Sequence, residues 1–241
     1  MTRSTTDRLL LAAHNNAVWC DAVARSHGVT TTLDAEAWTA ATRTPPFYPD
    51  AVTLSPDVED YDLLARVDDS DGCSVKDSWS RLDLSLEDFA RLVVGEWVWL
   101  DPSTHLPGSA GTAPRTWERV TTADELASWV QAWSTDPDAA AILRPGLLGE
   151  PGVHVLAGRN AVDPGAPVVA GAIVSVTGEV AGLGNIFARD GDEHRAWREA
   201  AAAAREVAGG IPLVGWEAGA SVEAALAAGC ERLGSLTVWL K

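Results

Sequence analysis

The sequence predicts an α/β (α+β) protein in which helices flank a mixed sheet. The clearest pattern is the run VVAGAIVSVTGEVAGLGNIF at 168–187, where Thr177–Gly178 separates two apolar stretches that we interpret as a β-hairpin. From there to residue 241 helical and extended patterns alternate, which adds parallel strands with helices on the faces of the sheet. A hydrophobic content of 46% with 22% charged residues is typical of a globular domain.

The composition argues against several kinds of partner. The net charge of −16 opposes binding of nucleic acid and anionic lipid and favours cationic partners, although solubility alone would also account for the acid excess. No apolar run approaches the ~18 residues of a membrane span. Cys20, Cys73 and Cys230 have neither CxxC nor metal-ligand spacing. We therefore expect a cytoplasmic protein with free thiols, no metal, no nucleic acid and no membrane partner; a homo-oligomer stays open.

The N-terminal half alternates helical and extended patterns. Apolar residues at helical spacing predict a helix over 9–27, and Gly28 ends it. The prolines of TRTPPFYPD, 42–50, exclude regular structure there. The remaining patterns predict strands at 51–54, 73–79 and 96–100 and helices at 58–67 and 85–94.

Residues 101–114, DPSTHLPGSAGTAP, are rich in proline and glycine and are the best linker candidate. They divide the chain into an N-terminal α/β half, 1–114, and a second domain, 115–241. Thr122 and Glu125 have the spacing of a capping box at a helix start. The second domain is predicted to contain strands at 116–120, 153–159, 168–176, 180–187, 212–218 and 235–240 and helices at 122–136, 192–207 and 221–234.

The order of elements in 115–241 resembles that of the GNAT superfamily, the acetyl-CoA-dependent N-acetyltransferases. PLVGWEAGASVEAALAAGCERLGSLTVWL, 212–240, resembles its closing strand-helix-strand unit, with Gly229–Cys230 where the family usually has Gly-Phe. The hairpin at 168–187 resembles its central strands. CSVKDSW…SLEDFARLVVGEWVWLDP in the first half has the same strand-helix-strand order and also contains V-W-L. The first half is then either a relic GNAT-like repeat or a chance similarity.

The resemblance implies a site for acetyl-CoA at the end of the central strand. The family's pyrophosphate loop, Arg/Gln-x-x-Gly-x-Gly/Ala, falls on Arg189-Asp190-Gly191-Asp192-Glu193-His194-Arg195, where no reading frame gives both glycines. Its acids oppose a phosphate, whereas backbone amides and arginines would attract one. Both pyrophosphate binding and ordinary helix capping stay open. The candidate cofactor-binding residues are Asn185, Ile186, Phe187, Ala188, Arg189, Gly191 and Arg195.

The resemblance also suggests catalytic residues and reveals a missing one. Glu217, at the end of the strand LVGWE, is the candidate base for an ammonium group, and His194 is the histidine nearest the site. Many family members have a tyrosine acid where this chain has Ala225. Two functions follow: an acetyl-CoA-dependent N-acetyltransferase acting on an amine or cationic small molecule, or a non-catalytic binding or assembly module that has lost CoA binding.

Overall fold

The structure is a computed structural model, and it describes residues 3–106, 115–136, 138–160 and 166–241. The chain forms two compact units, one of residues 1–97 with 233–241 and one of residues 98–232. The boundary predicted after residue 114 borders 107–114, outside the described residues, and stays a prediction.

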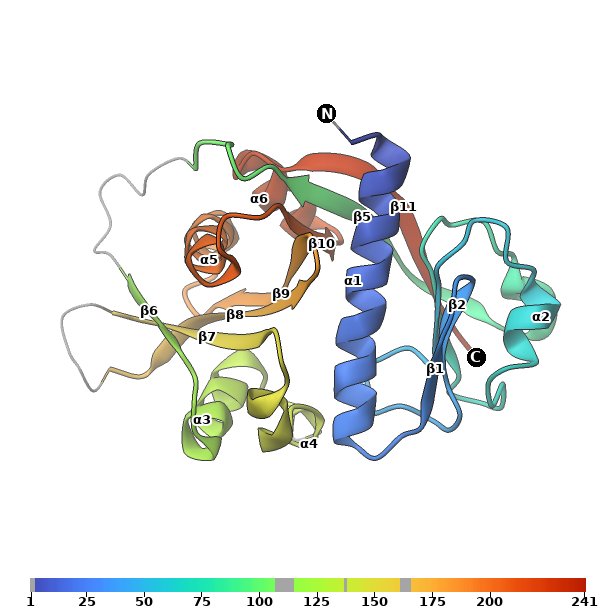
Figure 1. Ribbon diagram of the computed structural model, residues 1–241. Helices are drawn as coiled ribbons and strands as arrows, with labels where there is room; N and C mark the ends of the chain where they lie inside the picture. Colours follow the sequence, from blue (N-terminus) through green and yellow to red (C-terminus); the bar gives the residue numbers. More distant parts are fainter. Residues whose placement is uncertain (1–2, 107–114, 137, 161–165) are drawn as a thin grey trace. The chain divides into compact units, whose positions relative to one another are not determined.

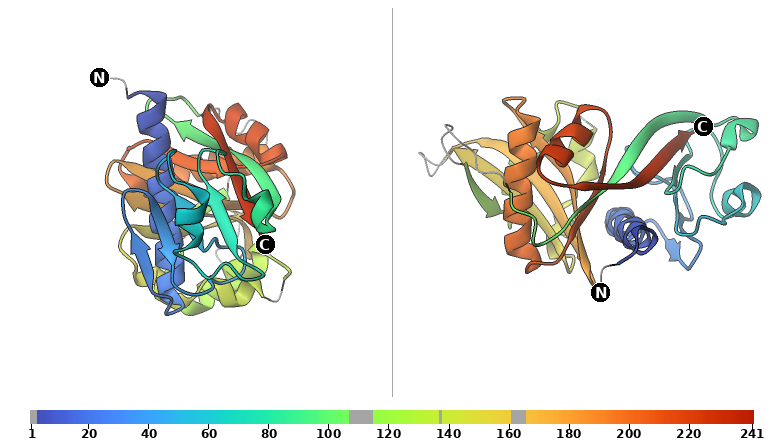
Figure 2. Two further views of the ribbon diagram at one scale, coloured as in Figure 1. Left: turned by 90° about the vertical axis from the view of Figure 1, so that its right-hand side faces the viewer. Right: turned by 90° about the horizontal axis from the view of Figure 1, so that it is seen from above.

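The first unit is a mixed sheet covered by a long helix. Its helices and strands are α1 (Thr5–Ser26), β1 (Thr31–Leu33), β2 (Ala37–Ala40), β3 (Ala51–Thr53), α2 (Asp60–Leu64), β4 (Ser74–Asp77), the 3₁₀ turn η1 (Leu84–Glu87), most of β5 (Ala90–Leu100) and most of β11 (Glu231–Leu240). The strand order is β1-β2-β3-β4-β11-β5. The pairs β1–β2, β2–β3 and β4–β11 are antiparallel, and the pair β3–β4 is parallel. Figure 2 shows α1 running along β1 and β2.

The second unit is also a mixed sheet. It contains β6 (Arg115–Arg119), α3 (Ala123–Trp133), α4 (Ala139–Ile142), η2 (Pro145–Gly149), β7 (Val153–Asn160), β8 (Val168–Thr177), β9 (Val180–Ala188), α5 (Glu193–Ala208), β10 (Leu213–Glu217) and α6 (Ala220–Ala227). The strand order is β6-β7-β8-β9-β10, followed by the end of β5. The predicted hairpin is β8–β9, and β9–β10 is the parallel pair. The predicted mixed sheet flanked by helices is confirmed.

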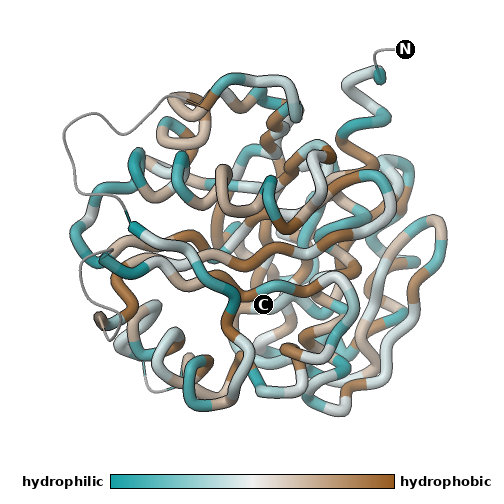
Figure 3. The backbone as a smooth tube through the Cα atoms, turned by 60° about the vertical axis from the view of Figure 1, so that its left-hand side comes forward, coloured by the Kyte–Doolittle hydropathy of each residue, from teal (hydrophilic) through white to brown (hydrophobic). Residues whose placement is uncertain are grey.

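The core of the second unit lies between the sheet and α5. Figure 1 shows α5 and α3 on opposite faces of the sheet, and Figure 3 shows hydrophobic residues concentrated along its strands. The α5 side is filled by small residues of the helix against aliphatic residues of the strands, among them Ala200, Ala204, Val174 and Leu183. Alanines let α5 lie close to the sheet, which brings the start of the helix next to the end of β10.

The two units repeat one arrangement, a strand followed by a helix and a parallel strand: β3–α2–β4 in the first and β9–α5–β10 in the second. The final strand of the chain does not complete the second unit. Residues Thr237–Leu240 pair antiparallel with Asp77–Ser74 in the first unit, and β5, the other strand with a V-W-L sequence, lies beside β11. The similarity seen in the sequence therefore reflects two strands with corresponding places in a repeated fold.

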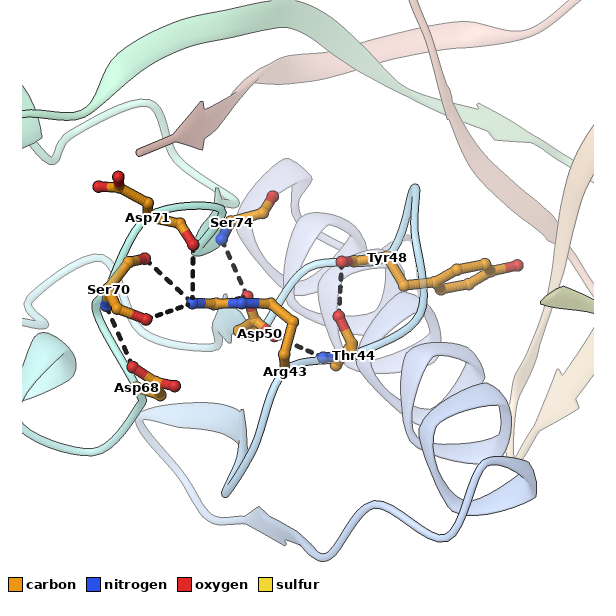
Figure 4. A network of polar contacts seen from close by, with 8 residues as sticks. All are labelled: Arg43, Thr44, Tyr48, Asp50, Asp68, Ser70, Asp71 and Ser74. Carbon is orange, nitrogen blue, oxygen red and sulfur yellow. Dashed lines mark hydrogen bonds and ion pairs between the residues drawn. The ribbon is translucent and has the colours of Figure 1, made fainter. Parts of the chain in front are cut away.

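A buried carboxylate organises the loops of the first unit. Asp50, 2% exposed, accepts hydrogen bonds from Arg43 Nη1 at 2.6 Å and from the amides of Thr44 at 2.8 Å and Ser74 at 3.0 Å (Figure 4). Arg43 Nη2 also donates to the carbonyl of Ser70 at 3.0 Å. These bonds hold the proline-rich segment 42–50, which the sequence correctly excludes from helices and strands, against the start of β4.

Three predicted helices are wrong in extent or type, and the one expected over 58–67 is only the short α2 (Asp60–Leu64). The helix expected over 85–94 is a 3₁₀ turn that stops at Asp88, where φ is 63°, and the chain then continues as β5. The helix expected over 221–234 ends at Ala227, because Gly229 takes a φ of 97° and β11 begins at Glu231. A side chain at 229 would lie 2.7 Å from Thr104 Cγ2, so glycine is required there. Strands β1 and β2 were not predicted.

Two other expectations, the free thiols and the capping box, agree with the structure. The three cysteines are free and buried. The capping box is present, with the amide of Glu125 donating to Thr122 Oγ1 at 3.3 Å and Glu125 Oε2 accepting from the Thr122 amide at 3.1 Å. No helix in the described residues is long and apolar enough to cross a membrane.

The position of β11 yields a stability prediction. Trp239 is 2% exposed and packs in the core of the first unit, whereas its neighbour Leu240 is 37% exposed. Trp239→Ala should lower the free energy of unfolding by about 3–5 kcal/mol, because it leaves a cavity in that core. Chemical denaturation followed by circular dichroism measures the loss.

Leu240→Ala is the matched control and should cost far less. Hydrogen exchange should locate the effect of Trp239→Ala in residues 37–77, although the substitution lies near the chain's end. Faster exchange confined to 123–227 would show that Trp239 supports the second unit instead.

Candidate functional site

The candidate site lies in the second unit, where β9 ends and α5 begins. The ladder between β9 and β10 joins Ala181 to Leu213 and Gly182 to Val214, at the starts of both strands. The strands remain close at Gly215, where a Cβ would lie 2.5 Å from the carbonyl oxygen of Leu183. The last residues of β9, 185–188, and of β10, 216–217, follow these two pairs towards the loops.

A bulge marks the outer part of β9. The register between β8 and β9 shifts between Gly171 and Ile173, and Asn185 takes a left-handed φ of 51°. A bulge bends a strand and increases its twist. The candidate residues Asn185–Ala188 therefore form the bent end of the strand that leads into the loop before α5.

The corresponding strands of the first unit are tied together at this point. The amide of Ser78 donates to Thr53 Oγ1 at 2.8 Å, and Ser78 Oγ donates to the carbonyl of Thr53 at 2.8 Å. Both residues are buried. The two bonds bridge the ends of β3 and β4.

The loop before α5 is held by a closed set of contacts that we call the Arg115 network. Arg115 Nη2 pairs with Asp190 Oδ2, and Asp190 Oδ1 accepts from the Asp192 amide at 3.2 Å. Asp192 Oδ1 caps α5 by accepting from the Arg195 amide at 2.9 Å. Arg195 Nε donates to Glu199 Oε1 at 2.7 Å, and Glu199 Oε2 accepts from Arg115 Nη1 at 3.2 Å. Every link joins a donor of this set to a carboxylate of the same set.

The network explains the ionisation of Asp190. Burial opposes its charged form, but the Asp192 amide and the Arg115 guanidinium outweigh burial and lower the pKa of Asp190. The Arg115 side chain is only 1% exposed, and its two carboxylate partners compensate for the hydration that the guanidinium loses. The network therefore favours the ionised form of Asp190.

A pyrophosphate would need the amides at the start of α5 and nearby cations. The loop uses these groups itself: the amide of Gly191 donates to Ala188 O at 3.1 Å, and that of Glu193 to Gly191 O at 3.1 Å. The amides of Asp192 and Arg195 donate to carboxylates of the network. The arranged donors therefore do not fit the pyrophosphate of CoA.

Glu217 is a carboxylate of the second unit whose surroundings oppose its charge. It ends β10, is partly exposed, and accepts a hydrogen bond from the buried Trp197 Nε1 at 3.2 Å. Burial raises its pKa to about 7; the Trp197 donor counteracts this and Glu193 adds to it. Ser221 Oγ donates to Glu193 Oε2 at 3.2 Å, so the starts of α5 and α6 meet near this carboxylate.

Glu217 has no cation of its own. In residues 3–106, 115–136, 138–160 and 166–241, no ion pair joins it to an arginine, lysine or histidine. A half-buried carboxylate without a cationic partner keeps its proton more readily. Its pKa near neutrality is the chemical feature that the sequence could not show.

The other candidate residues lie in different surroundings. His194 is exposed in the first turn of α5. Phe187 packs edge-on against Trp129, with ring centroids 5.1 Å apart, on the face away from α5. Ile186 packs against the α5 core, and the amide of Arg189 donates to the carbonyl of Val169 at 2.8 Å. The structure thus brings Glu217 together with Trp197 of α5.

Two departures from the family pattern also have structural explanations. Ala225 is fully buried against the core, so its place is filled by packing. Burial and, to a smaller extent, Glu217 raise the pKa of the Cys230 thiol to about 12, although Arg205 counteracts them. The sequence analysis missed Arg115, Glu199 and Trp197 as partners of the site. Among the residues described, no group of three or more metal-ligating side chains occurs.

Comparison with known proteins identifies the fold. No family model and no curated protein matches the sequence. Among solved structures, a GCN5-related N-acetyltransferase from Kribbella flavida is similar, with 15% identity, coverage of 95% of each chain and a TM-score of 0.57. A tandem GNAT protein from the clavulanic acid biosynthesis pathway, solved without acetyl-CoA, has 12% identity, coverage of 99% of this chain and 96% of its own, and a TM-score of 0.53. The chain therefore has the GNAT fold in a two-repeat form.

The raised pKa of Glu217 predicts a pH-dependent stability. Because its folded pKa of about 7 exceeds the ordinary value of 4.5, the folded protein keeps a proton that the unfolded chain has released. Stability from this group is present below pH 4.5 and is lost as pH rises through 7. At pH 8, Glu217→Gln should therefore exceed the wild type in free energy of unfolding by about 1–3 kcal/mol.

Urea denaturation between pH 5 and 8 measures this difference. The wild-type free energy of unfolding should decline with pH more steeply than that of the variant. Parallel curves would show that Glu217 has an ordinary pKa. Glu231→Gln, on an exposed carboxylate of β11, is the control for the loss of one charge.

Proposed function

We propose that this GNAT-fold chain binds a small-molecule amine at Glu217 and acts as a binding module rather than as a CoA-dependent catalyst. One observation carries the proposal: Glu217 is a partly buried carboxylate with a pKa of about 7 and no cationic partner among the described residues. An alkylammonium group would supply the missing charge and a hydrogen-bond donor.

The surroundings of Glu217 favour a cation over an anion. Glu193 raises the pKa of Glu217, so the two carboxylates repel each other across the starts of α5 and α6. An ammonium group placed at Glu217 relieves this repulsion, whereas an anion adds to it. Trp197 fixes the orientation of Glu217 by donating to one oxygen and leaves the other for the ligand. The net charge of −16 attracts a cation over longer distances.

An N-acetyltransferase acting on the same amine is the second candidate. Its support is the pKa of Glu217, which is suited to a general base that takes a proton from an ammonium group at neutral pH. The similar solved structures include an N-acetyltransferase, which gives the fold this chemistry as a precedent. The engaged donors before α5 argue against it.

The amine proposal predicts a pH-dependent affinity. In calorimetry, n-butylamine should bind the wild type more tightly at pH 8 than at pH 6, because binding needs the ionised form of Glu217. Glu217→Gln should weaken binding at pH 8 by about tenfold or more, since it removes the paired charge. The neutral n-butanol should not bind at either pH.

Glu223→Gln is the control, because Glu223 is an exposed carboxylate of α6 that pairs with Arg232 at 3.1 Å. It should leave butylamine affinity unchanged. Equal affinities of the wild type and Glu217→Gln would refute the proposed site.

A separate measurement tests the second candidate. Acetyl-CoA at 100 times its Kd would raise the free energy of unfolding by ~2.7 kcal/mol. We expect that millimolar acetyl-CoA does not raise the free energy of unfolding and that acetyl-CoA with n-butylamine gives no N-butylacetamide. A product that disappears in Glu217→Gln would instead establish acetyl transfer with Glu217 as the base.

A further inference from the structure

The Arg115 network is larger than a helix cap requires. Asp192 alone accepts the Arg195 amide and completes the start of α5. The network adds Arg115, which comes from β6 and lies 75 residues before Asp190 in the chain, together with Glu199 from the second turn of α5. Contacts so distant in sequence need a reason other than capping.

That reason is the burial of Arg115. Its side chain is 1% exposed, and an unpaired guanidinium at this depth would lose its hydration without compensation. Asp190 and Glu199 each take one of its terminal nitrogens. Asp190 can reach Arg115 only if the loop before α5 is folded back as observed. Arg115 therefore fixes the loop in one conformation.

This conformation uses the groups that would bind a phosphate. Arg195, the cation closest to the start of α5, is 8% exposed and donates to Glu199. Asp190 and Asp192 occupy the amides of Asp192 and Arg195. Three carboxylates and two guanidinium groups give the network a net charge of −1, so a phosphate would meet repulsion as well as occupied donors.

We infer that the carboxylates of the Arg115 network take the place of the CoA pyrophosphate and exclude CoA from the second unit. This inference does not depend on amine binding. Among the described residues, no hydrogen bond or ion pair joins the Arg115 network to Glu217, whose hydrogen-bond donor is Trp197. It explains how the loop can be ordered without a cofactor: the acids of the chain supply the negative charge that a helix start otherwise takes from a bound anion.

Calorimetry with CoA and with inorganic pyrophosphate tests the inference on the full chain. The variant is Asp190→Asn with Asp192→Asn, which removes two charges while asparagine keeps the ability to cap α5. The matched control is Glu118→Gln with Asp124→Asn, which removes two exposed charges from β6 and α3. Titrations at low and at 0.5 M salt separate electrostatic effects from contacts.

We expect no detectable binding of CoA by the wild type or the control at 1 mM. The variant should bind both ligands at least tenfold more tightly than the control at low salt, with a smaller gain at high salt. Micromolar CoA binding by the wild type would overturn the inference, as would a folded variant without any gain. Circular dichroism checks folding, and Asp190→Asn alone replaces the double variant if that variant unfolds.

Hydrogen exchange gives a second readout on the wild type. The Arg195 amide, capped by Asp192, should be protected, and its exchange should not change when CoA is added. A change on addition of CoA would mean that the ligand reaches the start of α5. Failure of butylamine binding leaves these results untouched, so the two proposals are judged separately.

Discussion

The buried guanidinium of Arg115 is the constraint on which the second unit depends. A charge that is 1% exposed must be paired on several sides, and here the partners are one carboxylate from the loop and one from α5. Because both must be present together, the edge strand β6, the loop and the helix start take one joint arrangement. If the loop opened towards an external anion, Arg115 would lose Asp190 and keep only the Glu199 carboxylate of this pair of partners.

The same constraint bears on Glu217. Arg115 and Arg195 pair with carboxylates of the network, and neither forms a described ion pair with Glu217 at the end of β10. Burial without a partner raises the pKa of that carboxylate to about 7. The network thus pairs its arginines with carboxylates of the chain, whereas Glu217 is the carboxylate to which the proposed ligand cation would bind.

The two units of the repeated fold differ at the ends of their parallel strands. In the first, the side chains of Thr53 and Ser78 bridge the parallel strands at their ends. In the second, the strand ends carry Glu217 and the bulged residues of β9 instead. The first unit also incorporates the last strand of the chain, whose Trp239 fills its core. The candidate site at Glu217 lies in the second unit.

The sequence by itself determined the elements whose patterns are local. The hairpin at 168–187, the capping box at Thr122 and the helix before Gly209 follow from periodicity and from residues within one turn, and these predictions are confirmed. It also placed Glu217 at a strand end. Tertiary structure alone decided that β11 joins the first unit, that Arg115 pairs with Asp190, and that burial shifts the pKa of Glu217. Those outcomes depend on contacts and solvent exposure set by residues far apart in the chain, which no local pattern records.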